Sequence, residues 1–60
     1  MKISKSALYK KTSIINVASY LEIPENRVGE ILDQFCIALE GNPFSNKKFI
    51  DYLVDEIEQN

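Results

Sequence analysis

Residues 18–32, ASYLEIPENRVGEIL, carry the pattern that decides the fold of this chain. Small or branched apolar residues recur along it at offsets of 0, 3, 5, 10 and 13 positions, namely Ala18, Leu21, Ile23, Val28 and Ile31. In a helix, residues three and four positions apart share one face, and here Pro24 stands between the two halves of the pattern. The stretch therefore predicts two helices that pack against each other across a tight turn.

The second of these helices is predicted to begin at Pro24, because the first helical position does not need a backbone N–H. Beyond it, one apolar stripe follows helical spacing: Val28, Ile31, Leu32, Phe35, Ala38 and Leu39. Gly41 is expected to end the helix in a left-handed conformation, and Pro43 prevents its continuation.

Two further segments complete an all-α prediction. Residues 4–21 have helical periodicity as one helix or as two, and we favour a break at Thr12 and Ser13, either of which could cap a new helix. The last helix is predicted to begin after Ser45 as N-cap, with Phe44 and Phe49 forming a hydrophobic staple. We expect a single domain over residues 1–60, built from three or four short helices.

The cysteine and histidine counts exclude several kinds of site. Cys36 is the only cysteine and the chain has no histidine, so neither an internal disulfide nor an ordinary Cys/His zinc site can form. Because Cys36 lies in an apolar stretch, we expect its thiol to be inert. We expect no metal, no cofactor and no enzymatic activity. A chain of 60 residues buries little surface, and this favours a homodimer or a bound partner.

Charge is unevenly distributed along the chain. Residues 1–20 carry four lysines and no acid (+4), residues 21–46 carry five acids and one arginine (−4), and residues 47–60 carry two lysines and four acids (−2). No stretch has the length and apolar character of a membrane span or a signal peptide. A cytoplasmic protein is therefore expected. The basic segment is either a solubilising tail or a surface that faces phosphate.

Residues 14–32 resemble the helix-turn-helix DNA-binding superfamily, in particular its repressor-like and antitoxin-like members. Ala18 matches the small residue that lets the two helices cross closely, Ile23 the apolar residue of the turn, and Val28 and Ile31 the core of the second helix. Glu22 departs from the family, which usually has glycine there, and a residue other than glycine is strained at positive φ.

The resemblance implies that the second helix enters the major groove of duplex DNA by its N-terminal end. Arg27 could then read guanine and Asn26 adenine, and Gly29 would allow close approach. Phosphate contacts would come from the segment before the first helix of the pair, at Lys10, Lys11, Thr12 and Ser13.

Two other interpretations remain open from the residues alone. Arg27 could merely pair with Glu30 or Asp33 on its own helix, and the apolar spacing could be that of a small helical core. Alternatively, the acidic helices could bind a protein, as in an enzyme inhibitor, an antitoxin or an assembly adaptor. The anchors for such a partner would be the apolar residues that exceed the needs of a small core: Tyr20, Ile37 and Tyr52.

Overall fold

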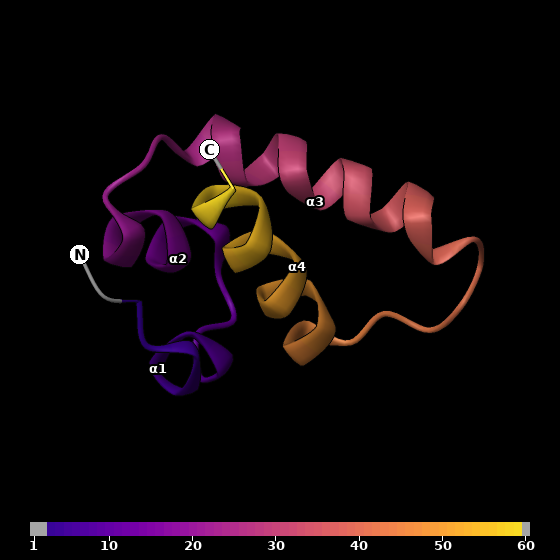
Figure 1. Cartoon of the computed structure of the whole chain (residues 1–60), viewed down its shortest axis with the longest axis horizontal. Coiled ribbons are helices and arrows are strands. Elements are labelled where there is room, and N and C mark those ends of the chain that lie inside the picture. Colours follow the sequence, from indigo (N-terminus) through magenta and orange to yellow (C-terminus); the bar gives the residue numbers. More distant parts are fainter. Residues whose placement is uncertain (1–2, 60) are drawn as a thin grey trace.

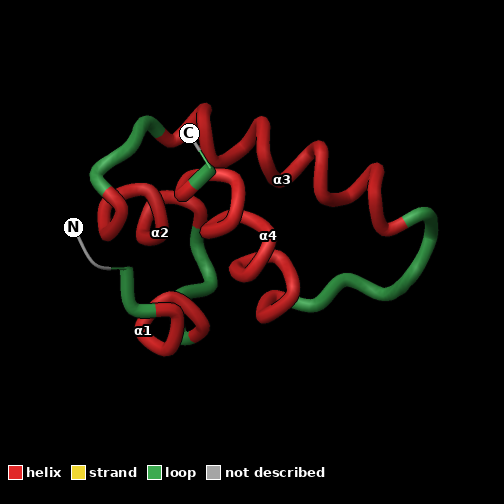
Figure 2. Tube along the Cα trace, in the orientation of Figure 1, coloured by secondary structure: helices red, strands yellow, loops and turns green. Residues whose placement is uncertain are grey.

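The computed structural model describes residues 3–59, so Lys2 of the basic segment lies outside the described residues. Within this range the only regular secondary structure is helical, without a strand, which confirms the all-α prediction (Figures 1 and 2). Its four helices are α1 (Lys5–Tyr9), α2 (Ile14–Leu21), α3 (Glu25–Leu39) and α4 (Asn46–Glu58). None of them combines the length and apolar character that crossing a membrane requires.

The predicted break in the N-terminal segment is confirmed, since α1 and α2 are separate helices. Ser13 is the N-cap of α2: its backbone is extended, and its hydroxyl accepts a hydrogen bond of 3.2 Å from the N–H of Ile15. Ser4 caps α1 in the same way, accepting from the N–H of Ala7 at 3.4 Å. Each cap satisfies a backbone donor that has no partner inside the helix.

The α2–α3 connection turns through a left-handed residue. Glu22 has φ 59° and ψ 42°, and the N–H of Ile23 donates to the carbonyl of Ala18 at 3.1 Å. This six-to-one hydrogen bond is typical of a Schellman helix end. Ala18, Val28 and Ile31 are all buried where α2 and α3 pack together. The sequence therefore located this turn and its core correctly.

The predicted bounds of α3 need small corrections at both ends. Pro24 has an extended ψ of 144° and is the N-cap, so the helix begins one residue later, at Glu25. At the other end, Glu40 already adopts the left-handed conformation with φ 53°, one residue before Gly41 with φ 86°. Asn42 then completes the end, donating from both its backbone N–H and its Nδ2 to the carbonyl of Leu39.

The start of α4 agrees with the sequence. The hydroxyl of Ser45 accepts a hydrogen bond from the N–H of Lys48 at 3.4 Å. The rings of Phe44 and Phe49 lie 6.2 Å apart between centroids, which is the contact expected of the hydrophobic staple. In Figure 1 the extended 40–45 connection brings the chain back, so that α4 runs beneath α3 toward α2.

All four helices contribute to one core, and the buried apolar residues come from each of them: Leu8, Val17, Ala18, Leu21, Val28, Ile31, Phe35, Phe49, Ile50, Leu53 and Val54. Ala38 of the predicted apolar stripe is instead exposed, and so are Ile14 and Ile15 at the start of α2. Cys36 is exposed too, contrary to the expectation of a thiol enclosed in an apolar stretch. Ile14 lies at the threshold of exposure, with 36% of its surface exposed, whereas Ile15 is 59% exposed.

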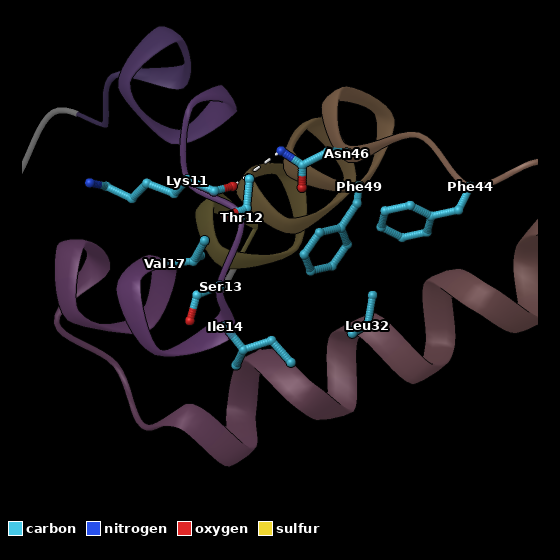
Figure 3. A pocket seen from close by; sticks show the side chains of 9 residues that line it. All are labelled: Lys11, Thr12, Ser13, Ile14, Val17, Leu32, Phe44, Asn46 and Phe49. Atoms are coloured by element: carbon cyan, nitrogen blue, oxygen red, sulfur yellow. Dashed lines mark hydrogen bonds between the residues drawn. The ribbon is translucent and has the colours of Figure 1, made fainter.

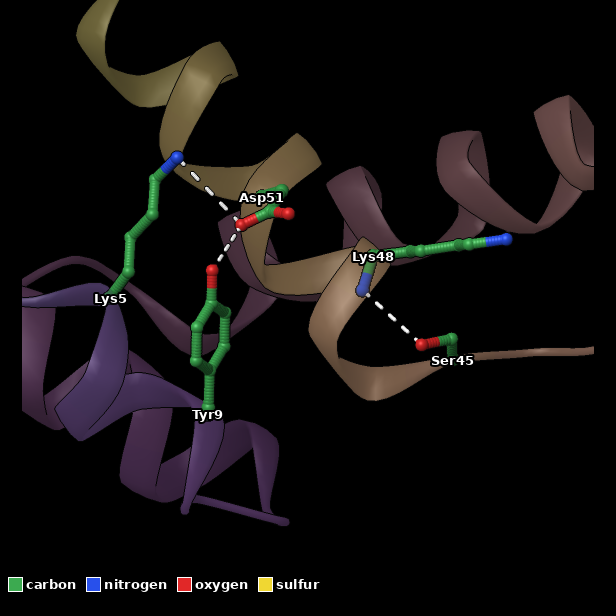
Figure 4. A network of polar contacts seen from close by, with 5 residues as sticks. All are labelled: Lys5, Tyr9, Ser45, Lys48 and Asp51. Atoms are coloured by element: carbon green, nitrogen blue, oxygen red, sulfur yellow. Dashed lines mark hydrogen bonds and ion pairs between the residues drawn. The ribbon is translucent and has the colours of Figure 1, made fainter.

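Polar contacts join α1 to α4 at the edge of the core. The Tyr9 hydroxyl donates to Oδ1 of Asp51 at 2.6 Å, and the same oxygen lies 3.7 Å from Lys5 Nζ (Figure 4). Asn46, at the start of α4, donates from Nδ2 to the carbonyls of Tyr9 and Lys11 at 3.2 and 3.3 Å. α4 therefore holds both α1 and the segment that leads into α2.

Candidate functional site

The first turn of α3 presents the side chains predicted to read bases. Asn26 and Arg27 are both exposed, two and three residues after the N-cap Pro24. No ion pair joins Arg27 to Glu30 or to Asp33 within residues 3–59. The guanidinium is therefore available to a ligand, and the alternative in which Arg27 is held by its own helix has no support in this part of the chain.

The remaining exposed surface near this turn is acidic. Glu25, Glu30 and Asp33 are exposed on α3 beside Asn26 and Arg27. Three carboxylates against one guanidinium give this end of α3 a net charge of −2. Such a surface repels a phosphate backbone but can accept hydrogen bonds from the amino group of cytosine.

The predicted phosphate contacts lie at the other end of α2. Lys10 and Thr12 are exposed, while Ser13 caps α2 with its hydroxyl. Lys11 Nζ lies 5.5 Å from the centroid of the Tyr20 ring, in a cation–π contact. In Figure 3 the Lys11 side chain lies on the side of α2 away from α3. Helix α2, whose eight residues span about 12 Å, lies along the chain between this segment and the turn that leads into α3.

A third lysine, Lys47, lies near this segment in space, and the sequence did not indicate it. Lys47 Nζ, from the start of α4, lies 5.7 Å from the centroid of the Tyr9 ring. Because Asn46 binds the carbonyls of Tyr9 and Lys11, the start of α4 and the end of α1 form one basic edge. The hydrogen bonds from Asn46 join these two elements. The spacing of apolar residues in the sequence does not predict such hydrogen bonds.

An apolar groove opens beside the start of α2. It has a volume of about 110 Å³ and is bounded by the start of α2, the middle of α3 and the residues around the start of α4 (Figure 3). Its lining residues are Lys11, Thr12, Ser13, Ile14, Val17, Leu32, Phe44, Asn46 and Phe49. Phe44 is 53% exposed and Ile14 36%, and Ile15 next to it is 59% exposed.

The three predicted partner anchors do not form one surface. The Tyr20 hydroxyl accepts a hydrogen bond from the N–H of Ser4, and the Tyr52 ring packs 5.4 Å from that of Phe35. Both tyrosines are half-buried and serve the fold. Ile37 is 77% exposed and follows Phe35 by two residues, so it lies about 200° around α3 from the core. The use of these three residues as partner anchors stays a prediction, and the residues of the groove are a second candidate for protein binding.

Comparison of this chain with protein-family models, with curated proteins and with solved structures finds no match.

Proposed function

We propose that this chain is a small helix-turn-helix regulator that binds duplex DNA as a dimer and has no enzymatic activity. The observation that carries the proposal is the α2–turn–α3 unit, with Ala18 in its crossing and Glu22 in the left-handed turn. The unit leaves Asn26 and Arg27 exposed in the first turn of α3. Those are the positions from which a recognition helix contacts base edges.

In the proposed complex the two parts of the site contact the same duplex. α2, which lies between Ser13 and the turn before α3, is about 12 Å long. With the first turn of α3 in the major groove, Lys10, Lys11 and Thr12 would face the phosphates at its edge. Arg27 would bind O6 and N7 of guanine, and Asn26 would bind N6 and N7 of adenine.

The acidic residues of α3 affect how much of the proposed binding comes from phosphate contacts and how much from base contacts. Glu25, Glu30 and Asp33 reduce the attraction between α3 and phosphates, so general affinity for DNA would be low. Base contacts would then supply an unusually large share of the binding free energy. A second copy of the chain would double those contacts, and this is why the proposal includes a dimer.

The proposal is tested by selecting a duplex from a random-sequence library and comparing Arg27→Ala with the unaltered protein. We expect the unaltered protein to enrich one sequence and Arg27→Ala to lose preference at a guanine of that sequence. Gln34→Ala is the matched control, because Gln34 is an exposed residue of the same helix outside the first turn. Failure of the unaltered protein to enrich any sequence would contradict the proposal.

Protein binding is the second candidate function, and the apolar groove favours it. Phe44, which lines the groove, and Ile15, which follows the groove residue Ile14, are each more than half exposed. Either a second copy or another protein would bury them. Sedimentation of the unaltered chain and of Ile15→Ser tests the first of these. A monomer in both cases would contradict the dimer.

A further inference from the structure

Asn46, the first residue of α4, binds the 10–13 connection that joins α1 to α2. Its Nδ2 donates to the carbonyl of Tyr9 at 3.2 Å and to the carbonyl of Lys11 at 3.3 Å, across 37 and 35 positions of sequence. Both hydrogen bonds are partly buried, and Figure 3 shows the amide of Asn46 directed at this backbone. Lys10 lies between the two carbonyls, so one side-chain amide holds the backbone on either side of it.

The connection runs from the end of one short helix to the start of another. At its start the N–H of Lys11 donates to the carbonyl of Leu8 at 3.0 Å, and at its end Ser13 caps α2. α1 has only five residues and is not stable alone, so it cannot hold the connection in place by itself. Asn46 ties the connection to α4, a thirteen-residue helix with several side chains in the core.

The start of α4 does not itself require an asparagine at position 46. The N-cap is Ser45, whose hydroxyl accepts from the N–H of Lys48 at 3.4 Å. Asn46 is the first residue after this cap, and its amide nitrogen is directed at another part of the chain instead of at its own helix. The two carbonyls of the connection therefore account for an amide side chain here, since one NH₂ group can donate two hydrogen bonds.

We propose that Asn46 is a positioning residue for DNA binding: its two hydrogen bonds fix the backbone from which Lys10 and Lys11 reach the phosphates of one duplex. This inference rests on the proposed DNA-binding function. Asn46 acts through the lysines and not on the duplex, because its amide nitrogen is already bound to the connection. A loose connection would have to become ordered on binding, which costs conformational entropy, whereas a fixed one avoids that cost.

A double-mutant cycle tests whether Asn46 acts through the lysines. The probe is the duplex that the unaltered protein enriches from a random-sequence library, titrated at low salt. Asn46→Ala removes both donors and should weaken binding roughly tenfold, the cost of ordering about one residue of backbone. In a protein that already carries Lys10→Ala and Lys11→Ala, the same substitution should leave the affinity unchanged. Asn46→Gln keeps the amide and should bind more tightly than Asn46→Ala.

Asn42→Ala is the matched control. The Nδ2 of Asn42 also donates to a backbone carbonyl, that of Leu39 at 2.7 Å, but it does so at the end of α3. This substitution should lower the Tm without weakening binding to the duplex. Both alanine variants should fold, because neither asparagine belongs to the buried core, and thermal unfolding checks this.

Two results would overturn the inference while leaving the proposed function in place. Equal weakening by Asn46→Ala with and without the two lysines would show that Asn46 supports the fold as a whole. No weakening in the protein that keeps both lysines would show that the connection needs no support for binding. If the unaltered protein binds no duplex, the proposed function and the inference are both wrong.

Discussion

The Tyr9 hydroxyl donates a 2.6 Å hydrogen bond to Asp51 across 42 positions of sequence, and so holds the short helix α1 against α4. This hydrogen bond raises the pKa of Tyr9, with smaller contributions from loss of solvent and from the negative charge of Asp51. A five-residue helix is not stable alone, so such contacts decide whether α1 belongs to the folded domain.

The raised pKa of Tyr9 predicts a loss of stability at high pH. The folded state holds the Tyr9 proton more tightly than the unfolded chain, whose pKa is near 10.0. The contribution of the Tyr9–Asp51 hydrogen bond to the free energy of unfolding is therefore complete below pH 10, and it is lost as the pH rises through the folded-state pKa of Tyr9. Urea unfolding from pH 8 upward should show this decline in the unaltered protein and less of it in Tyr9→Phe. Tyr52→Phe, which keeps the Tyr9 contact, is the control. Identical profiles for the unaltered protein and Tyr9→Phe would contradict the prediction.

Leu8 is the residue of α1 whose side chain is buried in the core, with 0% of its surface exposed. Leu8→Ala should lower the free energy of unfolding by about 2–5 kcal/mol, since it removes buried carbons and leaves a cavity. That is a large part of the total for a small domain. Ile37→Ala, at a 77% exposed position, should change it by at most about 0.5 kcal/mol. Equal effects of the two substitutions on urea unfolding would show that α1 is not part of the cooperative core.

Glu22 holds the α2–α3 turn at φ 59°, where a side chain is strained. Glu22→Gly should raise the free energy of unfolding by about 0.5 kcal/mol, because relief of strain exceeds the extra freedom that glycine gives the unfolded chain. Glu22→Val should lower it by at least about 1 kcal/mol, since a branched side chain fits this conformation poorly. Thermal unfolding of both variants measures the difference. The same Tm for Gly and Val would mean that residue 22 is not left-handed in solution.

Much of this fold could be predicted because local signals agreed with one another. Ser13 and Ser45 cap helices where the sequence placed caps, and the turn at Glu22 lies between two apolar patterns of the right spacing. Caps and turns depend on a few neighbouring residues, so a sequence can reveal them.

The exposed faces and the long-range contacts could not be predicted in the same way. α2 has apolar side chains on most of its surface, and periodicity does not say which of Ile14, Ile15 and Val17 meets another helix. The hydrogen bonds from Asn46 to the carbonyls of Tyr9 and Lys11 span at least 35 positions and leave no periodic trace. The groove and the basic edge both arise from such contacts, so only the arrangement of the helices shows them.

Fluorescence anisotropy of a labelled duplex at several salt concentrations tests the central proposal most directly. The duplex is the one that the unaltered protein enriches from the random-sequence library. Lys10 and Lys11 are the proposed phosphate contacts, so the slope of log Kobs against log salt should be roughly −2 per protomer. Replacing both lysines with alanine should bring the slope close to zero. Arg27→Ala should keep the slope while weakening binding to the enriched duplex by about 1–3 kcal/mol. Absence of binding at low salt would contradict the proposal that this chain is a DNA-binding regulator.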